Sequence, residues 1–182
     1  MLIDTQITIE NVIMCQKLSI PNLPLQSFVQ PCLKVIDAIR AWLESNAISE
    51  VECLVPDMTG NARGKFIPAH QFLSRADLKL PESIMIQTVT GEYTDVHWDF
   101  VEPTDTDMLL VPDPDSLRKV PWAREPTAQI IADCYKASGE PHPLASRNVL
   151  KHILRLYEEA GLRAQVAPEV EFFLVHKNTD PD

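Results

Sequence analysis

Two carboxylates stand two residues apart near the end of the sequence, and their type and spacing make them candidates for chemistry. Glu169 and Glu171 lie in the stretch 168–175, where β-branched and aromatic residues recur at every second position. This alternation predicts a β-strand. Both carboxylates would then project from one face of the strand, roughly 6–7 Å apart.

The residues around this pair leave two interpretations open. Phe173 and Val175 would share the face of the two glutamates, which argues against a plain solvated surface. Two carboxylates that point toward a part-buried site repel each other unless a cation lies between or beside them. Oxygen ligands suit hard divalent cations. The spacing is therefore compatible with a metal-binding pair and also with an ordinary acidic strand face.

The composition limits the class of protein. A chain of 182 residues suits one medium domain, or a small domain plus part of another. No apolar run reaches the roughly 18 residues that a membrane span needs, and no secretory signal pattern opens the sequence. The net charge of −10 opposes binding to nucleic acid. It suits cationic partners, but solubility alone is the commoner reason for such a charge. We expect a cytoplasmic protein with no membrane and no nucleic-acid partner.

The four cysteines are scattered and form no C-x-x-C pair. Three of them stand among apolar neighbours, which is typical of reduced, buried thiols in a cytosolic protein. They are Cys15, Cys32, Cys53 and Cys134.

Hydrophobic periodicity divides the chain into an N-terminal extension, a first unit of helices and strands, and the start of a second unit. Prolines interrupt any element within residues 1–27, which we assign to the extension. The first unit is predicted to contain a helix at 28–46, strands at 51–55 and 62–68, a short helix at 69–73, and strands at 84–89, 108–111, 120–122 and 127–135.

Charged residues gather at two places in this first unit. Arg63 and Lys65 flank Gly64 on the second strand, where they could form a charged face or anchor an anionic group or a neighbouring acidic loop. The segment 90–107 has no apolar period and is rich in Asp and Glu. Long loops of this kind are more often functional or mobile than idle.

Within this acidic segment, Trp98 beside Asp99 could form a wall of a cation-binding site. Asp95 is a second acidic candidate. We expect His97 to lie at the surface and not to ligate a metal.

Residues 139–143 mark a boundary rich in turn-forming residues. Ser146 can cap the helix that follows, which Gly161 closes. The stripe predicted to be buried on this helix consists of Leu150, Ile153, Leu154 and Tyr157. A helix and the Glu169 strand cannot bury both of their faces alone, so we expect the beginning of a larger domain.

Three motifs in this order resemble the N-terminal part of the glutamine synthetase family, and the branch that joins glutamate to putrescine and related polyamines is the most similar. The motifs are Asp-Met-Thr-Gly-Asn-Ala-Arg-Gly-Lys at 57–65, Ser-Arg-Asn-Val-Leu-Lys at 146–151 and Pro-Glu-Val-Glu-Phe-Phe at 168–173. The resemblance implies an α+β fold. A β-grasp-like N-terminal domain at 28–138 would precede the truncated start of the catalytic domain at 143–182, which contributes a helix and the E-x-E strand.

The resemblance also implies a chemistry. Two divalent cations, Mg²⁺ or Mn²⁺, would each take one ligand from the E-x-E strand. Glu171 would hold the ion nearer the glutamate and amine, and Glu169 the ion nearer the ATP phosphates. ATP would phosphorylate the glutamate side chain, and ammonia or a polyamine such as putrescine would attack the acyl phosphate.

In the family, an acidic residue of the N-terminal domain helps to bind and deprotonate the amine. The corresponding position here is Thr88, so Asp95 or Asp99 would have to serve instead. The family forms ring-shaped homo-oligomers whose active sites lie between adjacent subunits. Further family ligands lie downstream of these motifs, so we expect the present stretch to be inactive on its own.

Two alternatives stay open. The chain could be a non-catalytic β-grasp module that binds to a full-length ligase and regulates it. It could also be an unrelated β-grasp domain in which Glu169 and Glu171 are merely solvated.

Overall fold

The computed structural model describes residues 37–72, 74 and 78–177. The predicted extension 1–27 and residues 28–36 of the first predicted helix lie outside this part. The chain divides into two compact units, Met1–Leu150 and Lys151–Asp182, which are described separately.

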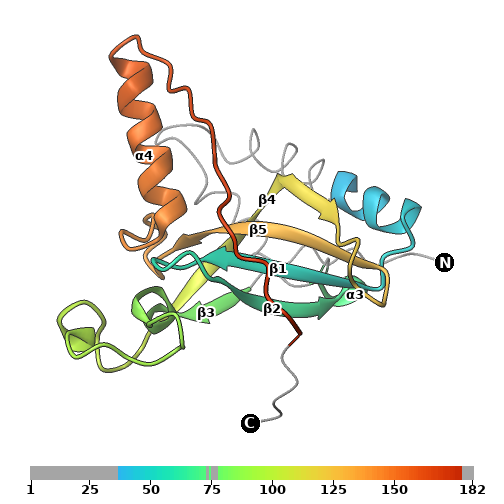
Figure 1. The fold of residues 1–182 in the computed structure, drawn as a ribbon, viewed down its shortest axis with the longest axis horizontal. Coiled ribbons are helices and arrows are strands. Elements are labelled where there is room, and N and C mark those ends of the chain that lie inside the picture. The colour runs from blue at the N-terminus through green and yellow to red at the C-terminus, as the bar shows by residue number, and fades with distance from the viewer. Residues whose placement is uncertain (1–36, 73, 75–77, 178–182) are drawn as a thin grey trace. The chain divides into compact units, whose positions relative to one another are not determined.

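A five-stranded mixed sheet forms the first unit (Figure 1). Its strands lie in the order β2-β1-β5-β4-β3, with β1 parallel to β5 and the other neighbours antiparallel. In chain order the elements are β1 (Glu50–Pro56), β2 (Ala62–Pro68), α3 (Ala69–Phe72), β3 (Lys79–Pro81), the 3₁₀ helices η1 (Glu82–Ile86) and η2 (His97–Asp99), β4 (Asp107–Lys119), β5 (Thr127–Tyr135) and α4 (Ser146–Glu159).

The hydrophobic core lies between this sheet and the helix at residues 37–45. Alternate residues of β1 are buried, and Ile130 of the neighbouring β5 packs in the same cluster. The helix contributes Ile39 and Leu43 to that cluster. Its end at residue 45 agrees with the predicted end at Asn46.

The two cysteines in the described part, Cys53 and Cys134, are free and buried in this core. Burial raises the pKa of each thiol to about 12, so both are protonated and unreactive at neutral pH. The prediction of reduced, buried thiols is confirmed for this pair, and Cys15 and Cys32 lie outside the described residues.

The hairpin of β1 and β2 has the predicted strands, with Cys53 opposite Lys65 and Leu54 opposite Gly64. Gly60 has φ +83° in the connecting turn, a conformation that glycine adopts without strain. Gly64 has a different role, because a Cβ at this position would overlap the backbone carbonyl oxygen of Cys53. The two strands can therefore approach this closely only with glycine at residue 64.

The strand β4 is longer than the predicted strand at 108–111. It continues through Pro112 and Pro114, with a register irregularity between Asp113 and Arg118. Proline is tolerated in a sheet at such bulges. Inside the irregularity, the Ser116 hydroxyl donates to the Asp113 carbonyl and accepts from the Ile131 amide, at 2.6 Å and 2.8 Å.

Two predicted strands of the first unit are wrong. Residues 82–86 form η1 instead of the start of a strand at 84–89, and the edge strand β3 lies earlier, at Lys79–Pro81. Residues 120–122 lie in a turn region and not in a strand. Short apolar runs fit a buried strand and a buried helical turn equally well, so periodicity could not distinguish them.

The second unit also differs from prediction. No residue of α4 is buried, and the stripe Leu150, Ile153, Leu154 and Tyr157 is 38–56% exposed. Residues 162–177 form no strand, and Phe173 is 95% exposed. A strand needs a neighbour for its backbone hydrogen bonds, and none of the described segments pairs with this one. No helix in the described part of the chain is long and apolar enough to cross a bilayer.

The close approach at Gly64 predicts a large effect of a small substitution. Gly64→Ala should lower the free energy of unfolding by about 2–3 kcal/mol, because the added methyl group must push the two strands apart. Urea denaturation followed by circular dichroism would measure this change. Lys65→Ala, at the next and exposed position, should stay within about 0.5 kcal/mol of the wild type. Equal stability of the two variants would contradict the close packing at Gly64.

Candidate functional site

The acidic segment 88–107 leaves the sheet after η1 and returns at β4 (Figure 1). Only His97 and Val101 are buried within it. Its other side chains are half-buried or exposed, and they include the two predicted amine-side residues. We call residues 88–107 the acidic loop.

The start of the acidic loop is a tight, self-bonded turn. The Thr88 amide donates to the Glu92 carbonyl at 2.8 Å, and the Gly91 amide donates to the Thr88 carbonyl at 2.9 Å. The Thr88 hydroxyl accepts from the Glu92 amide at 3.0 Å. Gly91 has φ +88°, which glycine adopts readily. This turn keeps its shape through its own hydrogen bonds.

A buried carboxylate organises the neighbouring β1–β2 turn. Oδ1 of Asp57 accepts from the amide and the hydroxyl of Thr59 and from the Asn61 amide, at 2.8–2.9 Å. Oδ2 of Asp57 accepts from Nε of Arg63 at 2.8 Å. Burial raises the pKa of this carboxyl, but the bonds to Arg63, Thr59 and Asn61 outweigh burial and lower the pKa overall. Asp57 is therefore ionised and fully hydrogen-bonded at neutral pH.

The β1–β2 turn holds the acidic loop at its start. Nη2 of Arg63 donates to the Thr88 carbonyl at 3.0 Å, and Nδ2 of Asn61 donates to the Val89 carbonyl at 3.0 Å. The sequence left open that Arg63 anchors a neighbouring acidic loop. The structure shows this contact, made through a backbone carbonyl and not through an acidic side chain.

The other end of the acidic loop is anchored to η1. Asp105, at φ +45°, accepts from the amide and the hydroxyl of the buried Ser83, at 3.0 Å and 2.8 Å. The Glu82 amide donates to the Thr106 carbonyl at 3.1 Å. The acidic loop is thus fixed at both of its ends.

Aromatic rings fill the middle of the acidic loop. The imidazole of His97 contacts two aromatic rings, with centroid distances of 4.5 Å to Tyr93 and 4.4 Å to Trp98. The prediction that His97 lies at the surface is wrong, because it is only 2% exposed. Nδ1 of His97 and Oγ1 of Thr94 are buried without a hydrogen-bond partner among the described residues.

The two predicted amine-side residues, Asp95 and Asp99, lie on either side of His97 and are exposed. Tyr93, Trp98 and Phe100, which lie within a few residues of them in the sequence, are exposed aromatic residues of the same loop. A carboxylate can pair with an ammonium group, and an aromatic face can attract the same cation or cover its alkyl chain. The acidic loop therefore offers both kinds of contact that an organic cation needs.

The predicted metal ligands Glu169 and Glu171 lie in the second unit, on the exposed segment 162–177. Their carboxylate oxygens are the donors that a hard divalent cation prefers, but Mg²⁺ needs about six oxygen ligands in octahedral geometry, of which two carboxylates supply only a part. The described residues contain no group of three or more His, Cys, Asp or Glu that could hold a metal ion. The described part of the chain thus does not fit a complete site for Mg²⁺ or Mn²⁺.

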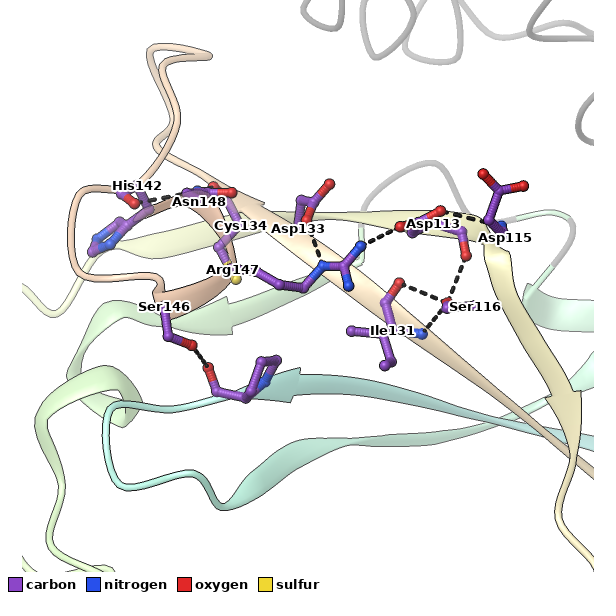
Figure 2. Close-up of polar contacts among 11 residues, drawn as sticks. Asp113, Asp115, Ser116, Ile131, Asp133, Cys134, His142, Ser146, Arg147 and Asn148 are labelled. Atoms are coloured by element: carbon purple, nitrogen blue, oxygen red, sulfur yellow. Dashed lines mark hydrogen bonds and ion pairs between the residues drawn. The ribbon is translucent and has the colours of Figure 1, made fainter. Parts of the chain in front are cut away.

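A second polar network connects the start of α4 to the sheet (Figure 2). The guanidinium of Arg147 bridges two carboxylates, those of Asp133 on β5 and Asp113 on β4, with Nε 2.8 Å from Asp133. Burial lowers the pKa of Arg147, but the two carboxylates outweigh this effect and raise it overall. Without Arg147, Asp113 and Asp133 would lose the cation that they share.

The residues around Arg147 tie this junction to both central strands (Figure 2). Nδ2 of Asn148 donates to the carbonyls of Cys134 and His142, and the Ser146 hydroxyl donates to the Pro56 carbonyl at 3.2 Å. Burial lowers the pKa of His142, although Glu82, 3.5 Å from its Nε2, opposes this shift. From the sequence, residues 146–151 were predicted to begin a helix and were one of the three motifs of the family resemblance, but their contacts with β4 and β5 were not predicted.

The ionised Asp57 predicts a pH-dependent stability. Its pKa in the folded state is lower than in the unfolded chain, so its stabilising effect is complete at neutral pH and is lost as the pH falls below about 4. Asp57→Asn should cost about 1–3 kcal/mol at pH 7, and this difference from the wild type should shrink as the pH falls below about 4. Urea titrations at several pH values would measure it. A pH-independent difference would contradict the assignment, and exposed Asp115→Asn is the control.

The bridge made by Arg147 predicts that removing this arginine lowers the stability of the protein more than removing another arginine of α4. Arg147→Met should lower the free energy of unfolding by about 2–3 kcal/mol, because two part-buried carboxylates lose their shared partner. Arg155→Met on the same helix removes an exposed pair with Glu159 and should cost less than about 0.5 kcal/mol. Thermal denaturation would compare them, and similar losses in both variants would count against the bridge.

The sequence of the chain is similar to those of several characterised enzymes. No protein-family model matches the chain. It is 31% identical over 150 residues to a glutamate–isopropylamine ligase of a Pseudomonas species, covering 79% of this chain and 32% of that protein. It is 29% identical to a glutamine synthetase of Halobacterium salinarum, with coverage of 79% and 30%. It is also 30% identical to the γ-glutamylethanolamide synthetase GlnA4 of Streptomyces coelicolor, with coverage of 76% and 31%.

Solved structures give the same result. The ligand-free structure of GmaS has a TM-score of 0.51 and 25% identity, covering 65% of this chain and 25% of that chain. A glutamine synthase homologue has a TM-score of 0.53 at 19% identity, which supports the fold alone. The chain spans about a third of the length of the curated relatives it matches. The resemblance drawn from the three motifs is therefore confirmed: the relatives of this chain are glutamine synthetases and glutamate–amine ligases.

Proposed function

We propose that the chain is the N-terminal portion of an ATP-dependent ligase that joins the side-chain carboxylate of glutamate to an amine. The observation that carries this proposal is the alignment of 79% of the chain with a glutamate–isopropylamine ligase. The sheet order, with a parallel central pair, supports the β-grasp-like domain that we assign to residues 28–138, and residues 143–182 would begin the catalytic domain.

The acidic loop is the part of the first unit suited to the amine. Asp95 and Asp99 expose carboxylates that can pair with an ammonium group, and Trp98 of the same loop exposes an aromatic ring. Ammonia would use only the charges, whereas an alkylamine or a polyamine such as putrescine would also cover apolar surface. The exposed rings therefore favour an organic amine over ammonia as the substrate.

Glu169 and Glu171 would supply one ligand each to the two divalent cations, Mg²⁺ or Mn²⁺, of the complete site. Such ions neutralise the charge of ATP as the phosphoryl group moves. Two exposed carboxylates cannot form that site alone. We therefore propose that residues 1–182 by themselves do not turn over substrate, and that a ring-shaped homo-oligomer places the first unit beside the site of a neighbour.

A second candidate function follows from the first unit. Its five strands and the helix at 37–45 share one hydrophobic core, so this unit has what an independent binding domain needs. It could act as a non-catalytic module that binds to a full-length ligase. A ligase assay on the longest protein that the natural gene encodes distinguishes the two functions. Only the first function predicts ATP hydrolysis that depends on glutamate and an amine.

The role of the acidic loop predicts a selective kinetic effect. In that longest encoded protein, Asp95→Asn with Asp99→Asn should raise the KM for the amine by about tenfold, because an ammonium group loses its charged partners. The KM values for glutamate and ATP should not change. Phosphate release with ammonium, isopropylamine, ethanolamine and putrescine would measure this. Glu44→Gln, an exposed acid on the first helix, is the control, and an unchanged amine KM would contradict the assignment.

A further inference from the structure

We infer that Arg63 is a positioning residue for the amine: together with Asn61 it fixes the start of the acidic loop to the β1–β2 turn and so sets the direction in which Asp95 and Asp99 are presented. This inference rests on the proposed function of the loop. Arg63 and Asn61 are half-buried, whereas the two candidate carboxylates of the acidic loop are exposed. Arg63 would therefore act on the amine indirectly, through the backbone of Thr88.

The geometry of the two anchoring bonds supports this role. Nη2 of Arg63 and Nδ2 of Asn61 reach consecutive carbonyl groups, those of Thr88 and Val89, each at 3.0 Å. Two bonds from different side chains to neighbouring residues restrict the turn more than one bond would, because both must break before the turn can move away from β1–β2.

Arg63 is itself held in place before it meets the loop. Its Nε donates to Oδ2 of the buried Asp57, which aims Nη2 at the Thr88 carbonyl. The side chain of Arg63 is 24% exposed and that of Asp57 is fully buried. A planar guanidinium can make both bonds at once, whereas the single ammonium group of lysine cannot match this fork.

The Thr88 carbonyl takes part both in the fold of the turn and in its anchoring to Arg63, through two different hydrogen bonds. It accepts from the Gly91 amide at 2.9 Å as well as from Arg63, and so uses both of its lone pairs. When Arg63 is lost, the bond to Gly91 remains. The turn can then still form its own hydrogen bonds, but it opens more often because its attachment to the β1–β2 turn is lost, which is the change expected of a positioning residue and not of a core residue.

Amide hydrogen exchange on the 182-residue chain is the first test. Arg63→Lys and Asn61→Ala should each make peptides covering 88–93 exchange about tenfold faster, because each removes one anchor. Peptides covering β5 should exchange as in the wild type. Lys65→Met, an exposed position on the same strand, is the control. Unchanged exchange at 88–93, or an equal increase in β5, would overturn the inference.

The second test is the steady-state ligase kinetics of the longest protein that the natural gene encodes. Arg63→Lys should raise the KM for the amine by about tenfold, with kcat and the KM for glutamate unchanged, because only the amine side is displaced. A fall in kcat with an unchanged amine KM would overturn the positioning role. A wild-type protein without any ligase turnover would instead overturn the proposed function, while the exchange experiment would still decide whether Arg63 anchors the loop.

Discussion

The parallel pairing of β1 with β5 is the constraint on which the first unit depends. Parallel neighbours cannot be joined by a tight turn, so the chain must leave β1 and return by a long crossover. Here the crossover contains β2, β3, the acidic loop and β4. Every residue that we assign to the amine side lies within it. The buried centre of the pair, with Val51 and Ile130, keeps both ends of the crossover fixed.

Parallel strands also bring their carboxyl ends to the same edge of a sheet, and two polar networks meet there. Asp57 follows the end of β1, and the segment that leads to Arg147 follows the end of β5. The 3.2 Å bond from the Ser146 hydroxyl to the Pro56 carbonyl joins them. Two of the three motifs that carry the family resemblance are therefore neighbours in space, although about eighty residues separate them in sequence.

Local sequence signals predicted those parts of the fold that depend mainly on neighbouring residues. The β1–β2 hairpin was predicted because its turn residues and alternating strands agree. β4 was cut short because Pro112 indicates a strand end, and only the bulge around Ser116 lets the strand continue. The strand predicted around Glu169 is absent because an alternating pattern does not by itself provide a neighbouring strand for hydrogen bonds.

The residues proposed for the candidate site came from the family resemblance, because Thr88 occupies the position of the family's acidic residue and Asp95 or Asp99 would have to replace it. Their role stays a prediction, and the contacts that support the loop were not predicted. The anchor made by Arg63 depends on a backbone carbonyl of Thr88, and backbone contacts leave no signature in side-chain spacing. The burial of His97 was missed because it depends on Tyr93 and Trp98 folding over it from the same loop.

The anchoring of the acidic loop at both ends has a consequence for how such a protein can diverge. Only His97 and Val101 are buried between the two anchors, so residues elsewhere in this loop can change in type and number without disturbing the sheet. Specificity and stability are then encoded in separate parts of the chain. Under the proposed function, the loop could adapt to a new amine by mutation while Asp57, Arg63 and Ser83 continue to hold its ends in place.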